Sequence, residues 1–180
     1  QWGQRQLDFN DLKQYKLANG NQRSWNRVSW DDGTPAYADN PYWIINENVS
    51  NDLRNRFYGN LSLTYNITPE LYVVGNAYGD TYSFNINERV AKGSQAESAY
   101  STITRTLTDF NYEGRLHFDK KFEKISLNTF VGANKRSYKY GSVSGTTVGG
   151  LVLPNQYNLS NSASTARASN YEEKTVTNSE

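Results

Sequence analysis

The feature that most constrains the fold is a strict two-residue alternation that runs from Arg56 to Ile67. The apolar or small members of this alternation are Phe57, Gly59, Leu61, Leu63, Tyr65 and Ile67, and polar or amphipathic residues separate them. Successive side chains of a β-strand point to opposite faces, whereas a helix repeats about every 3.6 residues. The breakers Thr68-Pro69-Glu70 then end the run, and a second strand-like run begins at Leu71. The sequence therefore predicts a long antiparallel hairpin over about 53–87 with one apolar and one polar face.

Further strands follow the hairpin along the chain. Residues 106–119 alternate as cleanly as the first run, and residues 125–138 place apolar or small residues on one face. We also expect a short strand at 23–30, and another polar strand or a linker at 172–180.

The connections between these strands alternate in length. Short turns are predicted at about 68–70 and 119–124, and long polar loops at about 31–52, 88–104 and 139–171. Short turns at one end and long loops at the other are typical of an outer-membrane barrel, whose strands need about 9–11 residues to cross the bilayer. A large soluble β-structure, in which the apolar stripes form a sandwich core, is the competing interpretation. Because a barrel needs about eight strands, the barrel interpretation makes this chain a fraction of a wall.

The composition excludes several classes of protein. Only 36% of the 180 residues are hydrophobic, yet 14 Tyr, 7 Phe and 4 Trp make the apolar content unusually aromatic. The mean hydropathy of −0.82 and the lack of an apolar run of about 18 residues exclude a helical membrane protein. With no Cys there is neither a disulfide nor a thiolate metal site, and a net charge of +1 gives no reason to expect nucleic acid as a partner. The chain begins without Met or a signal peptide, so we expect a piece of a longer protein.

No residue pattern indicates catalysis or a cofactor. His117 is the single histidine, without a carboxylate cluster that would suggest a metal site. The acidic pairs Asp31-Asp32 and Glu172-Glu173 are adjacent in sequence, whereas a glycosidase needs two carboxylates that face each other across a cleft. We therefore predict no catalytic residue, no metal and no cofactor.

Two loop segments carry a resemblance to a known family. The first is Asn40-Pro41-Tyr42-Trp43, followed by Glu47-Asn48 and by residues 54–60 (RNRFYGN). The second is residues 149–162 (GGLVLPNQYNLSNS). In this order and separation, with 78–82 and 89–94 between them, they resemble the SusC/RagA-type TonB-dependent transporters of Bacteroidota. The resemblance covers most of residues 40–180, and residues 1–39 match only loosely.

The resemblance implies an all-β fold and a function in transport. Residues 1–180 would form part of a transmembrane antiparallel β-barrel of 22 strands, closed by a plug domain that is not in this sequence. The protein would lie in the bacterial outer membrane, in contact with its lipid, and would not be an enzyme. It would import an oligosaccharide or oligopeptide, driven by TonB acting on the absent N-terminal region, with a SusD-like surface lipoprotein as a lid. The alternative function is that of a soluble or cell-surface β-rich carbohydrate-binding module.

Two groups of residues are candidates for contact with a substrate. Aromatic and amide side chains in the predicted extracellular loops would contact substrate or lid, or else pack among themselves: Tyr42, Trp43, Tyr157 and Asn158. Polar residues on the predicted lumen-facing side of the strands would line the solute path, or else pair across strands or with the plug: Arg56, Asn60, Asp109, Asn111, Glu113, Arg115 and His117.

Overall fold

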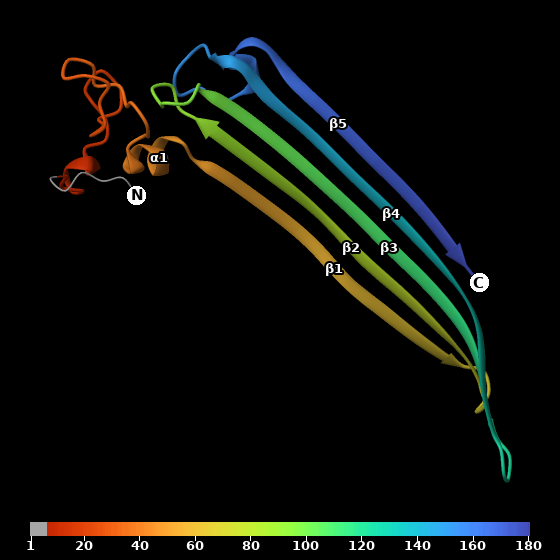
Figure 1. Cartoon of the computed structure of the whole chain (residues 1–180). Coiled ribbons are helices and arrows are strands. Elements are labelled where there is room, and N and C mark those ends of the chain that lie inside the picture. The colour runs from red at the N-terminus through yellow and green to blue at the C-terminus, as the bar shows by residue number, and fades with distance from the viewer. Residues whose placement is uncertain (1–6) are drawn as a thin grey trace. The chain divides into compact units, whose positions relative to one another are not determined.

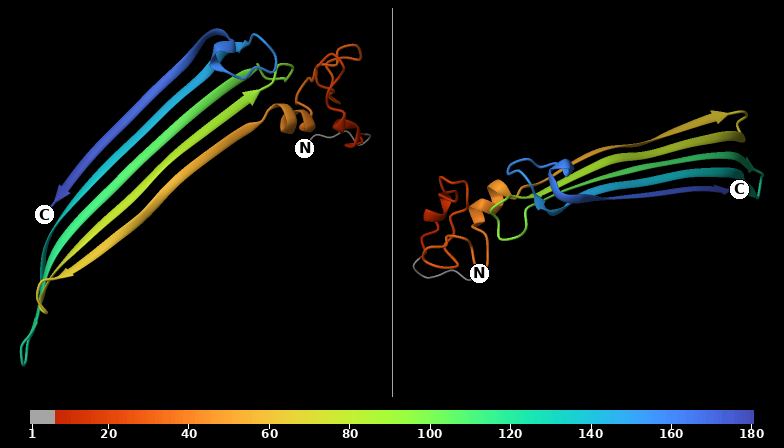
Figure 2. Two further views of the ribbon diagram at one scale, coloured as in Figure 1. Left: turned by 180° about the vertical axis from the view of Figure 1, so that it is seen from behind. Right: turned by 90° about the horizontal axis from the view of Figure 1, so that it is seen from above.

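The protein is all-β, with one antiparallel sheet of five strands, in a computed structural model that describes residues 7–180. The strands are β1 (Ser50–Asn66), β2 (Leu71–Val90), β3 (Ala99–Lys121), β4 (Ser126–Leu151) and β5 (Ser162–Ser179). Each strand pairs with the next along the chain, in the order β1-β2-β3-β4-β5 (Figure 1). β1 and β5 are therefore the two outer strands, which Figure 2 shows from behind and from above.

The hairpin predicted over 53–87 is confirmed, and both of its strands continue past the predicted ends. Its turn is residues 67–70, where the Thr68 hydroxyl accepts hydrogen bonds from the backbone N–H groups of Glu70 (3.3 Å) and Leu71 (3.0 Å). Such side-chain bonds to nearby N–H groups close a turn without a sheet partner. The next turn, predicted at 119–124, lies at 122–125 because β3 extends to Lys121.

Two of the three predicted long loops are shorter in the structure. The connection predicted at 88–104 is residues 91–98, and the one predicted at 139–171 is residues 152–161. The polar Gly- and Ser-rich sequence suggested a loop, but ladder hydrogen bonds need only the backbone, so such residues join strands when a neighbouring strand is present. Gly145 lies inside β4 for a packing reason. A Cβ there would be only 2.5 Å from Leu159 Cδ1, so the position has room only for glycine.

Residues 23–30, predicted as a short strand, do not form one. The isolated bridge Arg27–Pro35 is the only ladder contact of this segment, and another isolated bridge, Lys16–Gln22, precedes it. The Asn26 side chain binds the backbone of a later segment instead, accepting from Tyr37 N–H (2.9 Å) and donating to the Ala38 carbonyl (2.8 Å). Side chains that satisfy the backbone in this way compete with a sheet ladder.

The helix α1 (Pro41–Glu47) lies inside the segment predicted as a loop at 31–52. Asn40 caps it, since its side-chain oxygen accepts from Tyr42 N–H at 2.9 Å, and Pro41 takes the first helical position. Both residues are favoured at a helix start, because the cap satisfies a free N–H and proline has none to satisfy. The described part of the chain also contains two 3₁₀ turns, η1 (Asp11–Lys13) and η2 (Leu159–Asn161).

The chain divides into two compact units. The loop unit consists, among the described residues, of 7–52, Ile86–Ile103 and Ser144–Ser169; the strand unit is Leu53–Asn85, Thr104–Val143 and Asn170–Glu180. Within residues 7–180, the buried hydrophobic residues all belong to the loop unit: Leu12, Trp43, Ala91 and Leu151. No residue of the strand unit, which is described throughout, is buried. The strand unit is thus a sheet without an apolar core of its own.

Candidate binding surfaces

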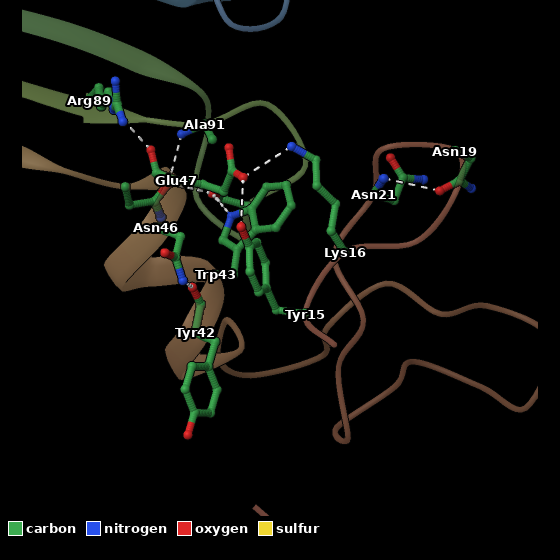
Figure 3. Close-up of polar contacts among 12 residues, drawn as sticks. Tyr15, Lys16, Asn19, Asn21, Tyr42, Trp43, Asn46, Glu47, Arg89 and Ala91 are labelled. Carbon is green, nitrogen blue, oxygen red and sulfur yellow. Dashed lines mark hydrogen bonds and ion pairs between the residues drawn. The ribbon is translucent and has the colours of Figure 1, made fainter. Parts of the chain in front are cut away.

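Trp43 is a packing residue of the loop unit. Only 1% of its surface is exposed, and its indole N–H donates to the Ser94 hydroxyl at 2.8 Å. The Tyr15 ring meets it edge-on at 6.3 Å between ring centroids, and Lys16 Nζ lies 5.7 Å from its ring (Figure 3). Because every side of this indole is occupied by the protein, it has no free face for a sugar or peptide.

Glu47 at the end of α1 joins three segments of the loop unit. Its carboxylate accepts from Lys16 Nζ at 3.0 Å, and its backbone carbonyl accepts from Arg89 Nε at 3.1 Å (Figure 3). Next to it, the Asn48 side chain accepts from Ala91 N–H at 2.8 Å. These bonds fix the end of the helix to the connection between β2 and β3.

Tyr157 and Asn158 also have roles within the protein. The Arg89 guanidinium lies 4.7 Å from the centroid of the Tyr157 ring. Partial burial raises the pKa of the Tyr157 phenol, and the nearby Arg89 charge partly opposes this shift. Asn158 caps η2, because its side-chain oxygen accepts from Asn161 N–H at 2.9 Å. Tyr42, in contrast, is half-buried, and its ring points away from Trp43 in Figure 3.

The acidic pair Asp31-Asp32 shapes a turn. The Asp31 carboxylate accepts from the Ser29 hydroxyl at 2.5 Å, and that of Asp32 accepts from Thr34 N–H at 2.9 Å. These hydrogen bonds lower the pKa of both carboxyls, so both are ionised at neutral pH. In residues 7–180 no group of three or more His, Cys, Asp or Glu side chains is arranged to hold a metal ion.

The strand unit carries a polar face, which includes all seven residues predicted to be lumen-facing. Its members alternate along β1 to β4 with apolar neighbours: Arg56, Asn60, Asp80, Asp109, Asn111, Glu113, Arg115, His117 and Arg136. The opposite, apolar face carries Phe57, Leu61, Leu63, Tyr65, Phe110, Tyr112, Leu116, Leu127 and Val131. Each apolar-face residue named here is more than a third exposed.

Two bidentate ion pairs join neighbouring strands across the polar face. Arg56 donates to both oxygens of Asp80, at 2.8 and 2.7 Å. Arg136 donates in the same way to Asp109, at 2.9 and 2.6 Å. The planar guanidinium matches a carboxylate in this two-bond geometry, so each pair fixes the register of its strands.

The remaining predicted residues of this face differ in their contacts. Glu113 accepts from Asn76 at 3.1 Å and pairs with Arg115. The His117 ring stacks between Tyr72 (4.8 Å between centroids) and Phe130 (5.4 Å). Asn111 Oδ1 is a buried acceptor without a partner. Asn60 is exposed on β1.

Sequence reasoning did not select several residues of the polar face. Asp80 and Arg136 were missed as pairing partners, and Tyr82 and Tyr138 were not among the candidate residues. Arg54 lies over the Tyr82 ring, 4.6 Å from its centroid, and was not selected either. The two-residue period assigns all of these side chains to their face, but only the register between strands shows which ones meet.

No protein-family model matches this chain, and no curated protein matches it. Among the described residues, no helix is long and apolar enough to cross a membrane.

Proposed function

We propose that this chain is part of the wall of an outer-membrane β-barrel that imports an oligosaccharide or oligopeptide. The observation that carries this proposal is the strand unit, which has one polar and one apolar face. The five strands that run through it are 17 to 26 residues long. A wall strand of a membrane barrel needs an apolar outer face and accepts a polar inner face. Ordinary globular strands have about five or six residues.

The apolar face supports lipid as its surroundings. Phe57 is 76% exposed, Leu63 66% and Val131 68%, and no other part of the described strand unit covers them. A sandwich would bury these side chains against a second sheet. In lipid the same side chains need no protein partner, so an uncovered apolar face favours the barrel over a soluble carbohydrate-binding module.

The transport mechanism follows from the resemblance to SusC/RagA-type proteins. In this proposal TonB supplies the energy through a plug domain, and a SusD-like lipoprotein covers the extracellular opening. The loop unit would then lie on the extracellular side, since it contains the longer connections. In this proposal the chain is part of the barrel wall of a transporter and has no enzymatic role.

Fractionation of cells that express the complete natural gene product tests this proposal. We expect the protein in the outer-membrane fraction, its extraction to require detergent, and its mobility in electrophoresis to change on heating as a folded barrel unfolds. A known periplasmic protein from the same cells is the control. Recovery of the protein in the aqueous fraction without detergent would contradict the proposal and favour the soluble carbohydrate-binding module.

A further inference from the structure

The apolar face of the strand unit contains a depression of about 450 Å³ that crosses β2, β3 and β4. Its lining consists of Val73, Gly114, Arg115, Leu116, Val131, Gly132, Ala133 and Glu180. Arg115 and Gly132 alternate with the apolar members of this set, and the Arg115 side chain pairs with Glu113 on the polar face. These two residues therefore border the depression through their backbone, and apolar side chains form most of its wall.

Missing side chains create the depression. A Cβ at Gly114 would meet nothing within 4 Å, and the same holds at Gly75 of β2. Asn76 donates to Glu113 on the polar face, which places their neighbours Gly75 and Gly114 side by side on the apolar face. Side chains around such a gap lack partners for dispersion contacts, so a flexible apolar chain that fills it is favoured.

Basic residues follow the depression along the same face. On β4, Lys135 comes two residues after Ala133 and Lys139 six residues after it. At the rise of a β-strand, these steps correspond to ~7 and ~20 Å. Lys174 of β5 shares this face, because Glu172, two residues earlier, pairs with Lys139 at 3.0 Å. We call Lys135, Lys139 and Lys174 the lysine cluster.

The lysine cluster has an excess of positive charge. Within residues 7–180, Glu172 is the one carboxylate that pairs with any of its members, and the Glu172 and Lys139 side chains are 65% and 58% exposed. Such an exposed ion pair is weak, so Lys139 is able to bind another anion. Lys135 and Lys174 are exposed. Glu180, the acidic residue of the depression, lies six residues past Lys174 and therefore at the end away from the lysine cluster.

The lysine cluster lies where the apolar face gives way to polar residues. On β2 this face continues past Gly79 with Thr81 and Ser83, and on β3 Thr106 and Thr108 precede Phe110. The outer face of a barrel wall is apolar across the hydrocarbon region and becomes polar at the level of the headgroups. Lysine reaches that level with an apolar stem, and its ammonium group is a point-charge partner for phosphate.

We propose that this face holds one anionic membrane lipid, with an acyl chain in the depression beside Gly114 and a phosphate headgroup at the lysine cluster. A zwitterionic lipid fits less well, because the lysines repel the positive group of its headgroup. Free phosphate fits less well, because it leaves the depression unfilled. This inference rests on the proposed function, since it requires the apolar face to lie in a membrane.

Native mass spectrometry of the complete natural protein in a non-ionic detergent tests this inference by lipid titration. The probes are phosphatidylglycerol and bisphosphorylated lipid A as anionic lipids, phosphatidylcholine as a zwitterionic lipid, and inorganic phosphate. We expect at least one anionic lipid to bind as a single saturable adduct, more tightly than phosphatidylcholine. Gly114→Leu, which fills the depression, should weaken this binding ~10-fold, the loss of about ten atom contacts. Lys135→Gln and Lys174→Gln should each weaken it ~5-fold.

Two matched controls should bind the lipid as the unmodified protein does. Gly59→Leu adds a side chain to the same face of β1, where a Cβ also meets nothing within 4 Å, and Lys120→Gln removes a charge near the other end of β3. Heat-dependent mobility verifies that each variant assembles, and Gly114→Val replaces Gly114→Leu if the latter does not.

The outcomes separate this inference from the proposed function. Equal binding of phosphatidylcholine, binding of inorganic phosphate alone, no saturable adduct, or full affinity in the Gly114 and lysine variants would overturn the inference. An outer-membrane protein without a discrete lipid adduct contradicts the lipid site alone. Recovery of the protein in the aqueous fraction contradicts the proposed function, whatever the titration shows.

Discussion

At the scale of single residues, the loop unit depends on a few buried polar side chains. Asn40 is 0% exposed, and its amide nitrogen donates to the carbonyls of Leu12 (3.0 Å) and Arg23 (2.8 Å) while its oxygen caps α1. The Gln22 side chain accepts from Asn40 N–H at 2.9 Å and donates to the Gly93 carbonyl at 2.8 Å. Buried amides that use all their bonding groups in this way hold irregular backbone in one arrangement.

Asn40→Asp tests this role. The substitution keeps the oxygen that caps α1 but removes both donors, which leaves two buried carbonyls facing a carboxylate. We expect the loop unit to be destabilised by about 2–6 kcal/mol, from about 1–3 kcal/mol for each buried acceptor that loses its partner. Hydrogen exchange of residues 7–48 in the complete protein measures the effect. Asn46→Asp, at an exposed position of the same helix, should change exchange little, and equal effects in both variants would contradict the assigned role.

The sequence alone could select aromatic residues of the predicted loops, but it could not show which contacts they make. Trp43 and Tyr157 could be selected as loop aromatics, but the burial of Trp43 depends on Gly93 and Ser94, about fifty residues away. A Cβ at Gly93 would lie 3.5 Å from the indole ring, at a φ of 101° that favours glycine. Such a contact joins distant segments, so no local pattern indicates it.

At the scale of elements, side-chain alternation predicted the central parts of four strands and did not predict where they end. The alternation arises from the pleat, which acts locally and is therefore readable in one sequence. Strand ends depend on whether the neighbouring strand continues, which is why β4 runs to Leu151 through a Gly- and Ser-rich stretch. The pairing of Arg56 with Asp80 likewise depends on register, and a slip by one residue would place the two on opposite faces.

Gly132 of β4 tests how closely β3 and β4 approach. A Cβ at Gly132 would lie 2.7 Å from the Gly114 carbonyl oxygen and 2.9 Å from Arg115 Cγ. Because a backbone atom cannot move aside without shifting its strand, we expect Gly132→Ala to lower the free energy of unfolding by about 1–3 kcal/mol. Denaturant titration of the complete protein in lipid vesicles gives this value. Gly75→Ala in β2, where a Cβ meets nothing within 4 Å, is the matched control and should cause no loss; a similar loss in both would remove the steric explanation.

Adjacent positions of β1 test the assignment of the two faces. Leu63 lies on the apolar face and Ser62 on the polar face, and both are exposed in the strand unit. If the apolar face meets lipid, Leu63→Arg should cost about 2–4 kcal/mol near the middle of the bilayer, and Ser62→Arg should cost far less. The same titration in vesicles measures both variants. Equal costs at the two positions would mean that the faces are assigned wrongly.

At the scale of the whole molecule, the sheet leaves β1 and β5 each with one unpaired edge. The unpaired N–H and C=O groups along such an edge form a template for another strand, and closure into a barrel is the one arrangement that removes edges. The same sheet exposes an apolar face without a covering layer. If the strand unit is part of a barrel wall, as we propose, further strands would pair these edges and lipid would cover the apolar face.

Residues 1–180 expressed alone should therefore not form a soluble folded monomer. In buffer without detergent, the two edges and the apolar face would pair with other copies, and we expect aggregates in the void volume of a size-exclusion column. Lys introduced at Leu61 and Leu63 of β1 should delay this aggregation more than Lys elsewhere on the strand, because it places charge on the exposed apolar face through which copies would associate. Lys at Ser62 and Thr64, on the polar face of the same strand, is the matched control for added charge alone. A monomer that elutes at its own mass and unfolds cooperatively would show that the five strands cover their edges and their apolar face without further strands, and would favour a soluble module over a barrel wall.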